Sequence, residues 1–335
     1  YLFLIKKNFY ATLFICLSAS FHPSYVLHSG FLMIGILSYF FFQKEYKKLF
    51  KILISYSIFI LPITLYIIYN FLLLDKEIIT EGQNILLKRI PHHALIDNWF
   101  SYKDILSILV YVVSLFLIHN NKRAFIPLFF FGFFSIFITL IQFFTEINSL
   151  ALIFPWRASV FLVPLSTMII ISFFLQKIDI QKSKFNLFSI FIFIILWISF
   201  FVDNHFIKNS NKVFYDKLKL TQEITKNYNS IERILIPVDL TYIRMNTGLP
   251  IFIDWKHHAF KYNEIIHWQK RMNLAKNFYA SNNLEKQKSI LVDINKIETI
   301  THILINKEKL NHNCDDLINH GEYSLVSVIN CYEIN

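Results

Sequence analysis

Seven long apolar runs, separated by short polar stretches, fill the first 202 residues of the chain. They predict helices at about 9–21, 25–42, 52–74, 104–119, 124–144, 151–175 and 185–202. A helix needs roughly 20 apolar residues to cross a bilayer, so the first and fourth runs need flanking residues at the interface to span it. The pattern therefore predicts an α-helical polytopic membrane bundle over residues 1–202, with about seven transmembrane helices.

The pattern changes after Val202, where short apolar runs alternate with helical periodicity. Strands are expected at Ile234–Val238, Ile251–Trp255 and Thr299–Asn306, with a last strand or hairpin at Tyr323–Ile334. Helices are expected at 211–229, 240–247 and 264–280. Alternating strands and helices indicate a small α/β domain over residues 203–335, which is long enough to form a core of its own.

Basic residues are concentrated on one side of the predicted helices. They lie in the stretches Lys6–Lys7, 43–51, 120–123 and 176–184. These stretches hold 11 Lys and Arg against 2 acidic residues, and so account for 9 of the net charge of +10. Because short loops rich in Lys and Arg stay in the cytoplasm, we expect them inside and residues 203–335 outside. The predicted location is the bacterial inner membrane, with an extracytoplasmic C-terminal domain.

The composition is that of a membrane protein. Hydrophobic residues make up 55% of the chain and charged residues only 17%, which excludes an ordinary soluble domain. Residues 203–335 carry 17 Lys and Arg against 15 Asp and Glu, so no basic stripe remains to follow the phosphates of a nucleic acid. The expected partners are membrane lipids, whose anionic inner leaflet suits the basic loops, and not nucleic acids.

The chain begins with Tyr1 rather than Met, and we expect a further N-terminal portion to precede it. Two of the three cysteines, Cys314 and Cys331, fall in the domain expected outside, where disulfides persist. Whether they form a bridge stays open, because the sequence gives no distance between them.

The longest polar interval of the predicted bundle, 75–103, is expected on the outer side. A loop of this length in a compact bundle is usually functional rather than connective. Its segment 85–90 could lie on the membrane surface as a short amphipathic helix. Arg89, His92 and His93 are its candidate substrate-binding residues.

Adjacent histidines raise the question of a metal ion. Neutral imidazole is a common metal ligand, and a second pair occurs at His257 and His258. No spacing matches a zinc pattern such as HExxH or paired CxxC, and adjacent histidines on one element point in different directions. We therefore assign no metal ligand and prefer substrate-facing loop residues, while a divalent metal cofactor stays open.

Arg157 follows Pro155 and Trp156 near the outer end of an otherwise uncharged apolar run. An arginine at this depth is costly, so we expect a pairing partner or an anionic ligand. The alternative is a side chain that reaches the headgroup water by itself. Trp156 is expected to anchor the segment at the interface, and Pro155 to interrupt the helix and open a site.

The densest group of polar and aromatic residues follows the predicted strand at 251–255. Ligands of open α/β sheets bind at the carboxyl ends of parallel strands, which makes Asp254 the candidate catalytic acid or base. Arg244, Lys256 and Arg271 could hold a phosphate, and Trp255 could stack on a sugar ring. The alternative is a set of domain-stabilising ion pairs with the tryptophan in the core. No P-loop, GxGxxG or GxSxG signature is present.

Several short motifs follow one another along the chain. They are His22–Tyr25, Arg89–His93, Phe154–Ser159, Val163–Pro164 and Thr247–Lys256, followed by Trp268 and Arg271. Their order resembles a bacterial membrane-protein family known only as a domain of unknown function. The resemblance extends over nearly the whole chain, and its most specific parts are the Pro-Trp-Arg and Thr-Gly…Asp-Trp-Lys segments. It implies no established activity.

The architecture also resembles the GT-C class of glycosyltransferases, which implies transfer of a sugar from a polyprenyl-phosphate carrier. In this interpretation Arg157 and Arg89 hold the lipid phosphate, and Trp255, Lys256 and Arg271 shape the acceptor pocket. That class carries an acidic residue in its first outer loop. The interval 22–24 has none, so the base is expected upstream of Tyr1.

Two other functions remain as alternatives: a transporter or flippase for a lipid-linked or anionic solute, and a non-catalytic component of a membrane assembly. The near absence of charge at mid-membrane speaks against transport.

Overall fold

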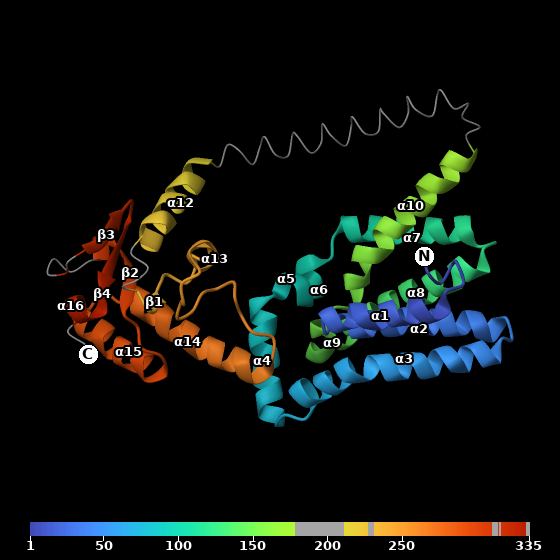
Figure 1. Ribbon diagram of the computed structural model, residues 1–335, viewed down its shortest axis with the longest axis horizontal. Coiled ribbons are helices and arrows are strands. Elements are labelled where there is room, and N and C mark those ends of the chain that lie inside the picture. Colours follow the sequence, from blue (N-terminus) through green and yellow to red (C-terminus); the bar gives the residue numbers. More distant parts are fainter. Residues whose placement is uncertain (178–210, 227–230, 310–313, 315, 333–335) are drawn as a thin grey trace. The chain divides into compact units, whose positions relative to one another are not determined.

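The computed structural model divides the chain into two compact units, Tyr1–Ile180 and Gln181–Asn335 (Figure 1). The residues that it describes are 1–177, 211–226, 231–309, 314 and 316–332. The predicted seventh helix, 185–202, and the predicted domain boundary after Val202 lie outside them.

The described part of the first unit is built from helices. They are α1 (Asn8–Phe21), α2 (Tyr25–Phe42), α3 (Tyr46–Ile67), α4 (Lys76–Arg89), α5 (Pro91–Ala94), α6 (Ile96–Trp99), α7 (Tyr102–Ile118), α8 (Lys122–Thr145), α9 (Asn148–Leu152) and α10 (Ser159–Lys177). A π-helical turn, η1 (Ile68–Leu72), extends α3, and a 3-10 turn, η2 (Pro155–Ala158), leads into α10. Helices α1, α2 and α3 pack against one another, and α2 also packs along α8 (Figure 1).

Four described segments are long and apolar enough to cross a membrane, namely Tyr25–Phe42, Tyr46–Leu72, Lys122–Thr145 and Asn148–Leu175. Helix α1 has 14 residues and α7 has 17, so both are short for a span, as expected for the first and fourth apolar runs. The protein is therefore a mostly helical membrane protein, and of the six expected spans within the described residues, four have a helix of sufficient length.

Helices α2 and α8 approach each other closely at a glycine. A Cβ atom placed on Gly35 would lie 2.6 Å from Cα and 2.8 Å from the carbonyl oxygen of Pro127. At Gly132 of α8, the missing side chain makes room for the ring of Tyr111 from α7. Small residues at such contacts allow helix backbones to meet inside a bilayer, where packing rather than the hydrophobic effect holds helices together.

Hydroxyl groups add polar contacts between the same helices. The hydroxyl of Tyr111 donates to the carbonyl oxygen of Phe129 at 3.0 Å, and the buried Ser114 of α7 donates to Ser166 of α10 at 3.0 Å. Both contacts satisfy polar atoms within the bundle, where water is scarce.

The interval 75–103 is ordered as α4, α5 and α6. Leu86, Leu87 and Ile90 are buried on one side of α4 and its end. The segment is therefore a helix with one apolar face, which packs within the protein, and its expected position on the membrane surface stays a prediction. Leu87 and Ala94 form a small core with α9. The buried Gln142 of α8 donates to the carbonyl oxygen of Ala94 at 2.8 Å. These contacts fix the segment against the ends of α8 and α9.

The second unit combines helices with a small sheet. Its elements are α12 (Asn211–Lys226), β1 (Ile234–Leu235), α13 (Tyr242–Thr247), α14 (Tyr262–Ala280), α15 (Leu284–Ile297), β2 (His302–Asn306), η4 (Lys307–Lys309), β3 (Asp316–His320), β4 (Tyr323–Ser327) and α16 (Val328–Tyr332). The strand order is β1-β2-β4-β3, with β1 and β2 parallel and the other pairs antiparallel. Helix α12 packs on this sheet through Leu220 and Ile224, in one core with Leu304 and Leu325.

Prolines shorten the predicted parallel strands. The expected strand Ile234–Val238 is reduced to the two residues of β1, and Ile251–Trp255 makes only one parallel bridge, between Ile234 and Ile251. Pro237 and Pro250 stand in or before these runs, and proline cannot donate to a ladder. The second run still lies along β1, because the N–H of Trp255 donates to the carbonyl oxygen of Val238 at 2.8 Å.

The end of the chain also differs from the prediction. The strand expected over Tyr323–Ile334 ends at Ser327 and continues as α16, whereas β3 was not expected. Cys314 and Cys331 form a disulfide that ties the approach to β3 to α16, which answers the question that the sequence left open.

We expect this disulfide to appear in the number of reactive thiols. In protein denatured without reductant, a thiol reagent should label Cys16 alone, and after reduction it should label all three cysteines. Replacing both bridged residues with serine should lower the free energy of unfolding by about 3 kcal/mol, as for a closed loop of this length. Mass spectrometry of the labelled peptides reads the first outcome, and three labelled cysteines before reduction would contradict the bridge.

The close approach at Gly35 predicts a sharp difference between two glycines of α2. Gly35→Ala should destabilise the protein by about 1–3 kcal/mol, because the new methyl group forces α2 away from α8. Gly30→Ala is the matched control, since a Cβ there would meet only the hydroxyl of Tyr56 at 3.8 Å. Unfolding of both variants in detergent measures the difference, and equal stabilities would refute the contact.

Candidate functional site

A reversal of the backbone presents Arg157 at the surface of the helical unit. Phe154 has a positive φ of 48°, in the left-handed region that bulky residues avoid. This turn separates α9 from α10 and allows Pro155 to begin η2, where its fixed φ suits a first helical position. Within η2, Trp156 and Ala158 point inward and are buried, whereas Arg157 is exposed.

Trp156 anchors the reversal. Its indole N–H donates to Oδ1 of Asp104 at 3.0 Å. The other oxygen of Asp104 accepts from the backbone N–H and the hydroxyl of Ser101, both at 3.0 Å, in the capping box of α7. Both oxygens of this carboxylate are therefore engaged in holding η2 and α7 in place.

The guanidinium of Arg157 lies among aromatic rings. Its central carbon is 5.6 Å from the ring centre of Tyr25 and 6.0 Å from that of Phe154, within the range of cation–π contacts. Among the described residues, Arg157 forms no ion pair and no side-chain hydrogen bond. Its positive charge is thus oriented but not neutralised.

The charge of Arg157 affects the pKa of two nearby histidines. Burial lowers the pKa of His22, and the charge of Arg157 lowers it further. For His93 the causes are burial, the neighbouring His92 and Arg157, in that order. Both rings therefore favour the neutral form at neutral pH. We call Arg157, His22, Tyr25, His93 and Phe154 the Arg157 cluster.

The neutral ring of His22 has a defined tautomer. Its Nδ1 atom lies 3.3 Å from the backbone nitrogen of Ser24, which can only donate, and 2.8 Å from the Ser24 hydroxyl. Nδ1 is therefore an acceptor, and the ring proton sits on Nε2. His22 can offer an N–H donor without adding a second positive charge.

The contact between α2 and the segment that carries Arg157 was not predicted from the sequence. The buried ring of His28 links them, because its Nδ1 lies 2.9 Å from the carbonyl oxygen of Ser24 and its Nε2 lies 3.2 Å from that of Pro155. The signal in the sequence is the three-residue spacing of His22, Tyr25 and His28, which places Tyr25 and His28 on one face of a helix.

The remaining residues predicted for this site belong to the α4–α5 segment. His93 reaches the cluster, with its ring centre 6.4 Å from that of Phe154. His92 is exposed and lies beside His93, with 4.2 Å between the ring centres. Arg89 is half-buried in the last turn of α4. Among the described residues, no three His, Cys, Asp or Glu side chains gather as metal ligands.

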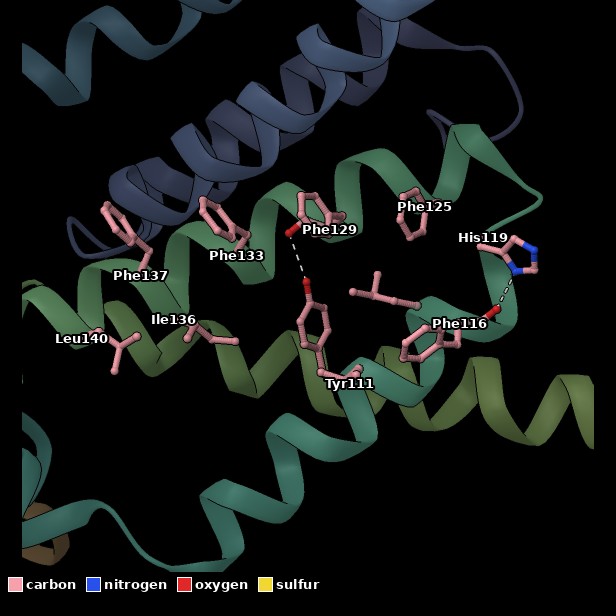
Figure 2. A pocket seen from close by; sticks show the side chains of 11 residues that line it. Tyr111, Phe116, His119, Phe125, Phe129, Phe133, Ile136, Phe137 and Leu140 are labelled. Atoms are coloured by element: carbon pink, nitrogen blue, oxygen red, sulfur yellow. Dashed lines mark hydrogen bonds between the residues drawn. The ribbon is translucent and has the colours of Figure 1, made fainter.

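An apolar groove of about 630 Å³ runs between α7 and α8 in the same unit (Figure 2). On α8 its wall is a ladder of four phenylalanines, Phe125, Phe129, Phe133 and Phe137, whose successive ring centres are 5.8 Å apart. On α7, Tyr111 turns its hydroxyl toward the backbone of α8. The lining thus suits a hydrocarbon chain.

In the second unit, Asp254 organises a loop. It is fully buried, and its Oδ1 accepts the backbone N–H groups of Lys256 at 2.9 Å and His257 at 2.8 Å. Nδ1 of His257 lies 2.8 Å from Oδ2. The indole of Trp268 donates to the carbonyl oxygen of Asp254 at 3.2 Å. The candidate acid or base predicted from sequence is therefore closed off from solvent by its own neighbours.

Two of the predicted binding residues, Trp255 and Lys256, belong to this loop, and a third, Arg244, lies beside it. Nη1 of the exposed Arg244 lies 3.9 Å from Oδ2 of Asp254. Nζ of Lys256 contacts the sulfur of Met245 at 3.8 Å. The ring of Trp255 is 38% exposed, with Nζ of Lys276 at 4.7 Å from its centre. The loop therefore presents an exposed aromatic ring and cations together.

Arg271 has a different environment. Its guanidinium donates to Oε1 of Glu298 at 3.0 Å, and Nε of Arg233 lies 3.6 Å from the other oxygen. Its central carbon is 5.5 Å from the ring centre of Phe252. These contacts are those of a domain-stabilising ion pair, the alternative that the sequence left open.

Comparison with known proteins adds one match. Residues 216–275 match a family described as a domain of unknown function (DUF6798). No curated protein and no solved structure matches the chain. The matched segment contains Arg244, the Asp254 loop and Trp268, in agreement with an uncharacterised family, and it carries no activity with it.

The charge of Arg157 predicts a shift in two histidines. Arg157→Gln should raise the pKa of His22 and of His93, because a positive charge that opposes their protonation is removed. Lys103→Gln removes another exposed cation of this unit, one that contributes to neither shift, and should leave both unchanged. NMR titration of histidine-labelled protein measures this, and unchanged values in Arg157→Gln would place the guanidinium elsewhere.

Proposed function

We propose that the protein is a GT-C-like glycosyltransferase of the bacterial inner membrane. It takes a sugar from a polyprenyl-phosphate carrier at the outer face, where residues 203–335 also lie. Arg157 binds the phosphate of the carrier, and the α4–α6 segment borders the site.

The observation that carries this proposal is the state of Arg157. Its guanidinium is exposed, has no ionic partner among the described residues, and is oriented by the rings of Tyr25 and Phe154. A planar guanidinium can donate two parallel hydrogen bonds to a phosphate. An anion that binds there would balance a charge that no described residue balances.

The two neutral histidines fit a phosphate rather than a simple carboxylate. A phosphate presents several acceptor oxygens, and Arg157 can serve two of them. His22 carries its ring proton on Nε2 and can donate to another, as can His93 in one of its tautomers. The cluster thereby supplies several donors with only one full positive charge, which suits a phosphate that is already esterified to a lipid.

The groove between α7 and α8 supports the lipid part of the proposal (Figure 2). A polyprenyl chain needs an apolar surface that it can follow, and the phenylalanine ladder of α8 provides one. The groove belongs to the same unit as Arg157. Trp156, the residue before Arg157, holds η2 against α7, which forms one wall of the groove.

Charge distribution favours this proposal over transport. Apart from Arg157, the charged residues of the four candidate spans all lie within their first two turns. A transporter is expected to place coupling groups near the middle of the membrane. A single cation at one end suits binding from one face.

Binding of farnesyl phosphate, a short isoprenoid phosphate, tests the role of Arg157. Arg157→Gln should weaken binding about tenfold to a hundredfold, as expected when a charged hydrogen-bond donor is lost. Arg157→Lys should retain part of the affinity, because a lysine keeps the charge but not the forked geometry. Lys103→Gln should bind as the wild type does.

Farnesol, which lacks the phosphate, is the matched ligand control. The proposal fails if wild-type protein in nanodiscs binds farnesol as tightly as farnesyl phosphate, or if Arg157→Gln binds the phosphate undiminished. Transfer of a radiolabelled sugar from a polyprenyl-phosphate donor should be lost in Arg157→Gln, and persistence of that transfer would remove the arginine from the mechanism.

A further inference from the structure

The ring of His257 has one nitrogen fixed by a carboxylate. Its Nδ1 lies 2.9 Å from Oδ1 and 2.8 Å from Oδ2 of Asp254. An ionised carboxylate only accepts hydrogen bonds, so Nδ1 must carry a proton. In the neutral ring, Nε2 then holds the lone pair.

The other nitrogen is turned away from this contact. The side chain of His257 is 36% exposed, whereas that of Asp254 is fully buried. Among the described residues, no hydrogen-bond partner of Nε2 is found. A ligand can therefore reach the ring, while the buried carboxylate of Asp254, whose Oδ2 also lies 3.9 Å from Nη1 of Arg244, holds the other nitrogen.

The position of the ring is set in advance. Asp254 is held by two backbone N–H groups, and its carbonyl oxygen accepts from the indole of Trp268. A base whose partner is fixed in this way needs no rearrangement when it accepts a proton. His267, exposed on α14, has no carboxylate partner among the described residues and is a natural comparison.

We propose that His257 is a proton-accepting site of the C-terminal unit, with Asp254 as its positioning residue and a sugar phosphate as its ligand class. A ligand hydroxyl donates a hydrogen bond to the lone pair of Nε2, the position from which the ring can accept a proton. The carboxylate of Asp254 balances the imidazolium that forms. Exposed Trp255 offers a face for the sugar ring, and Arg244 and Lys256 offer cations for its phosphate. This inference goes beyond the role of Arg157 and does not depend on it.

A purely structural role is the alternative, because Asp254 also closes the loop. The substitution Asp254→Asn distinguishes the proton-accepting role from the structural role. The amide oxygen can still accept the backbone N–H groups of Lys256 and His257, so the turn is kept. The amide NH₂ replaces Oδ2, so Nδ1 faces a donor at the position where the wild type has an acceptor at 2.8 Å. This contact opposes a proton on Nδ1, although the amide oxygen remains near it, and favours the tautomer with the proton on Nε2 and no outward lone pair.

The test follows His257 in the full chain in nanodiscs. Nitrogen NMR of labelled histidine should show Nδ1 protonated in the wild type and Nε2 protonated in Asp254→Asn. Diethyl pyrocarbonate at mildly alkaline pH should modify His257 faster than His267. Asp254→Asn should slow the modification of His257 by about tenfold, the scale on which an orienting carboxylate acts, and leave His267 unchanged. Equal rates for the two histidines, or no effect of Asp254→Asn, would overturn the proposal.

Glucose 1-phosphate tests the ligand class. It should shift the Nε2 signal of His257 and protect the ring from diethyl pyrocarbonate, whereas glucose at the same concentration should do so less. Arg244→Gln together with Lys256→Gln should abolish the difference between the two compounds. If glucose 1-phosphate leaves both the signal and the modification rate unchanged, sugar phosphates are excluded as the ligand.

Discussion

The close packing of α2 on α8 is the constraint on which the Arg157 cluster depends. With Gly35 against the backbone of Pro127, the two helices cannot shift without opening a gap. Turn η2 packs on both of them, and His28 reaches from α2 to the carbonyl oxygen of Pro155. The direction in which Arg157 points is therefore set by a helix contact that lies outside the cluster itself.

Three arginines of the chain differ in their hydrogen-bond and ionic partners, and this difference decides whether the side chain can bind a ligand. Arg123 donates to the carbonyl oxygen of Phe3 and to Oδ1 of Asn8, both at 2.7 Å, and Arg271 donates to Glu298. Both are committed to holding elements together. Arg157 has aromatic neighbours but no anion among the described residues. An oriented cation without a counter-charge remains able to bind one, which is why the proposed function rests on it.

The sequence predicted most of the helices, because apolar length and amphipathic spacing are local properties. It placed Arg157 and Trp156 at a site because a charge in an apolar run stands out. It could not pair Trp156 with Asp104, 52 residues away, since only tertiary packing brings them together. The predicted parallel strand 234–238 was too long. Its apolar residues are typical of a strand, but Pro237 has no N–H to donate to the neighbouring strand.

Burial decides which member of the Asp254 loop can do chemistry. The sequence indicates Asp254, a carboxylate at the end of the predicted strand 251–255. In the fold this carboxylate is fully buried and cannot contact a ligand hydroxyl. Its charge acts through the residue three positions later, His257, whose side chain is partly exposed and has one ring nitrogen against the carboxylate. The sequence does contain this spacing. Only the fold shows that the aspartate lies inside and the histidine outside, and that order assigns the positioning role to Asp254 and the proton to His257.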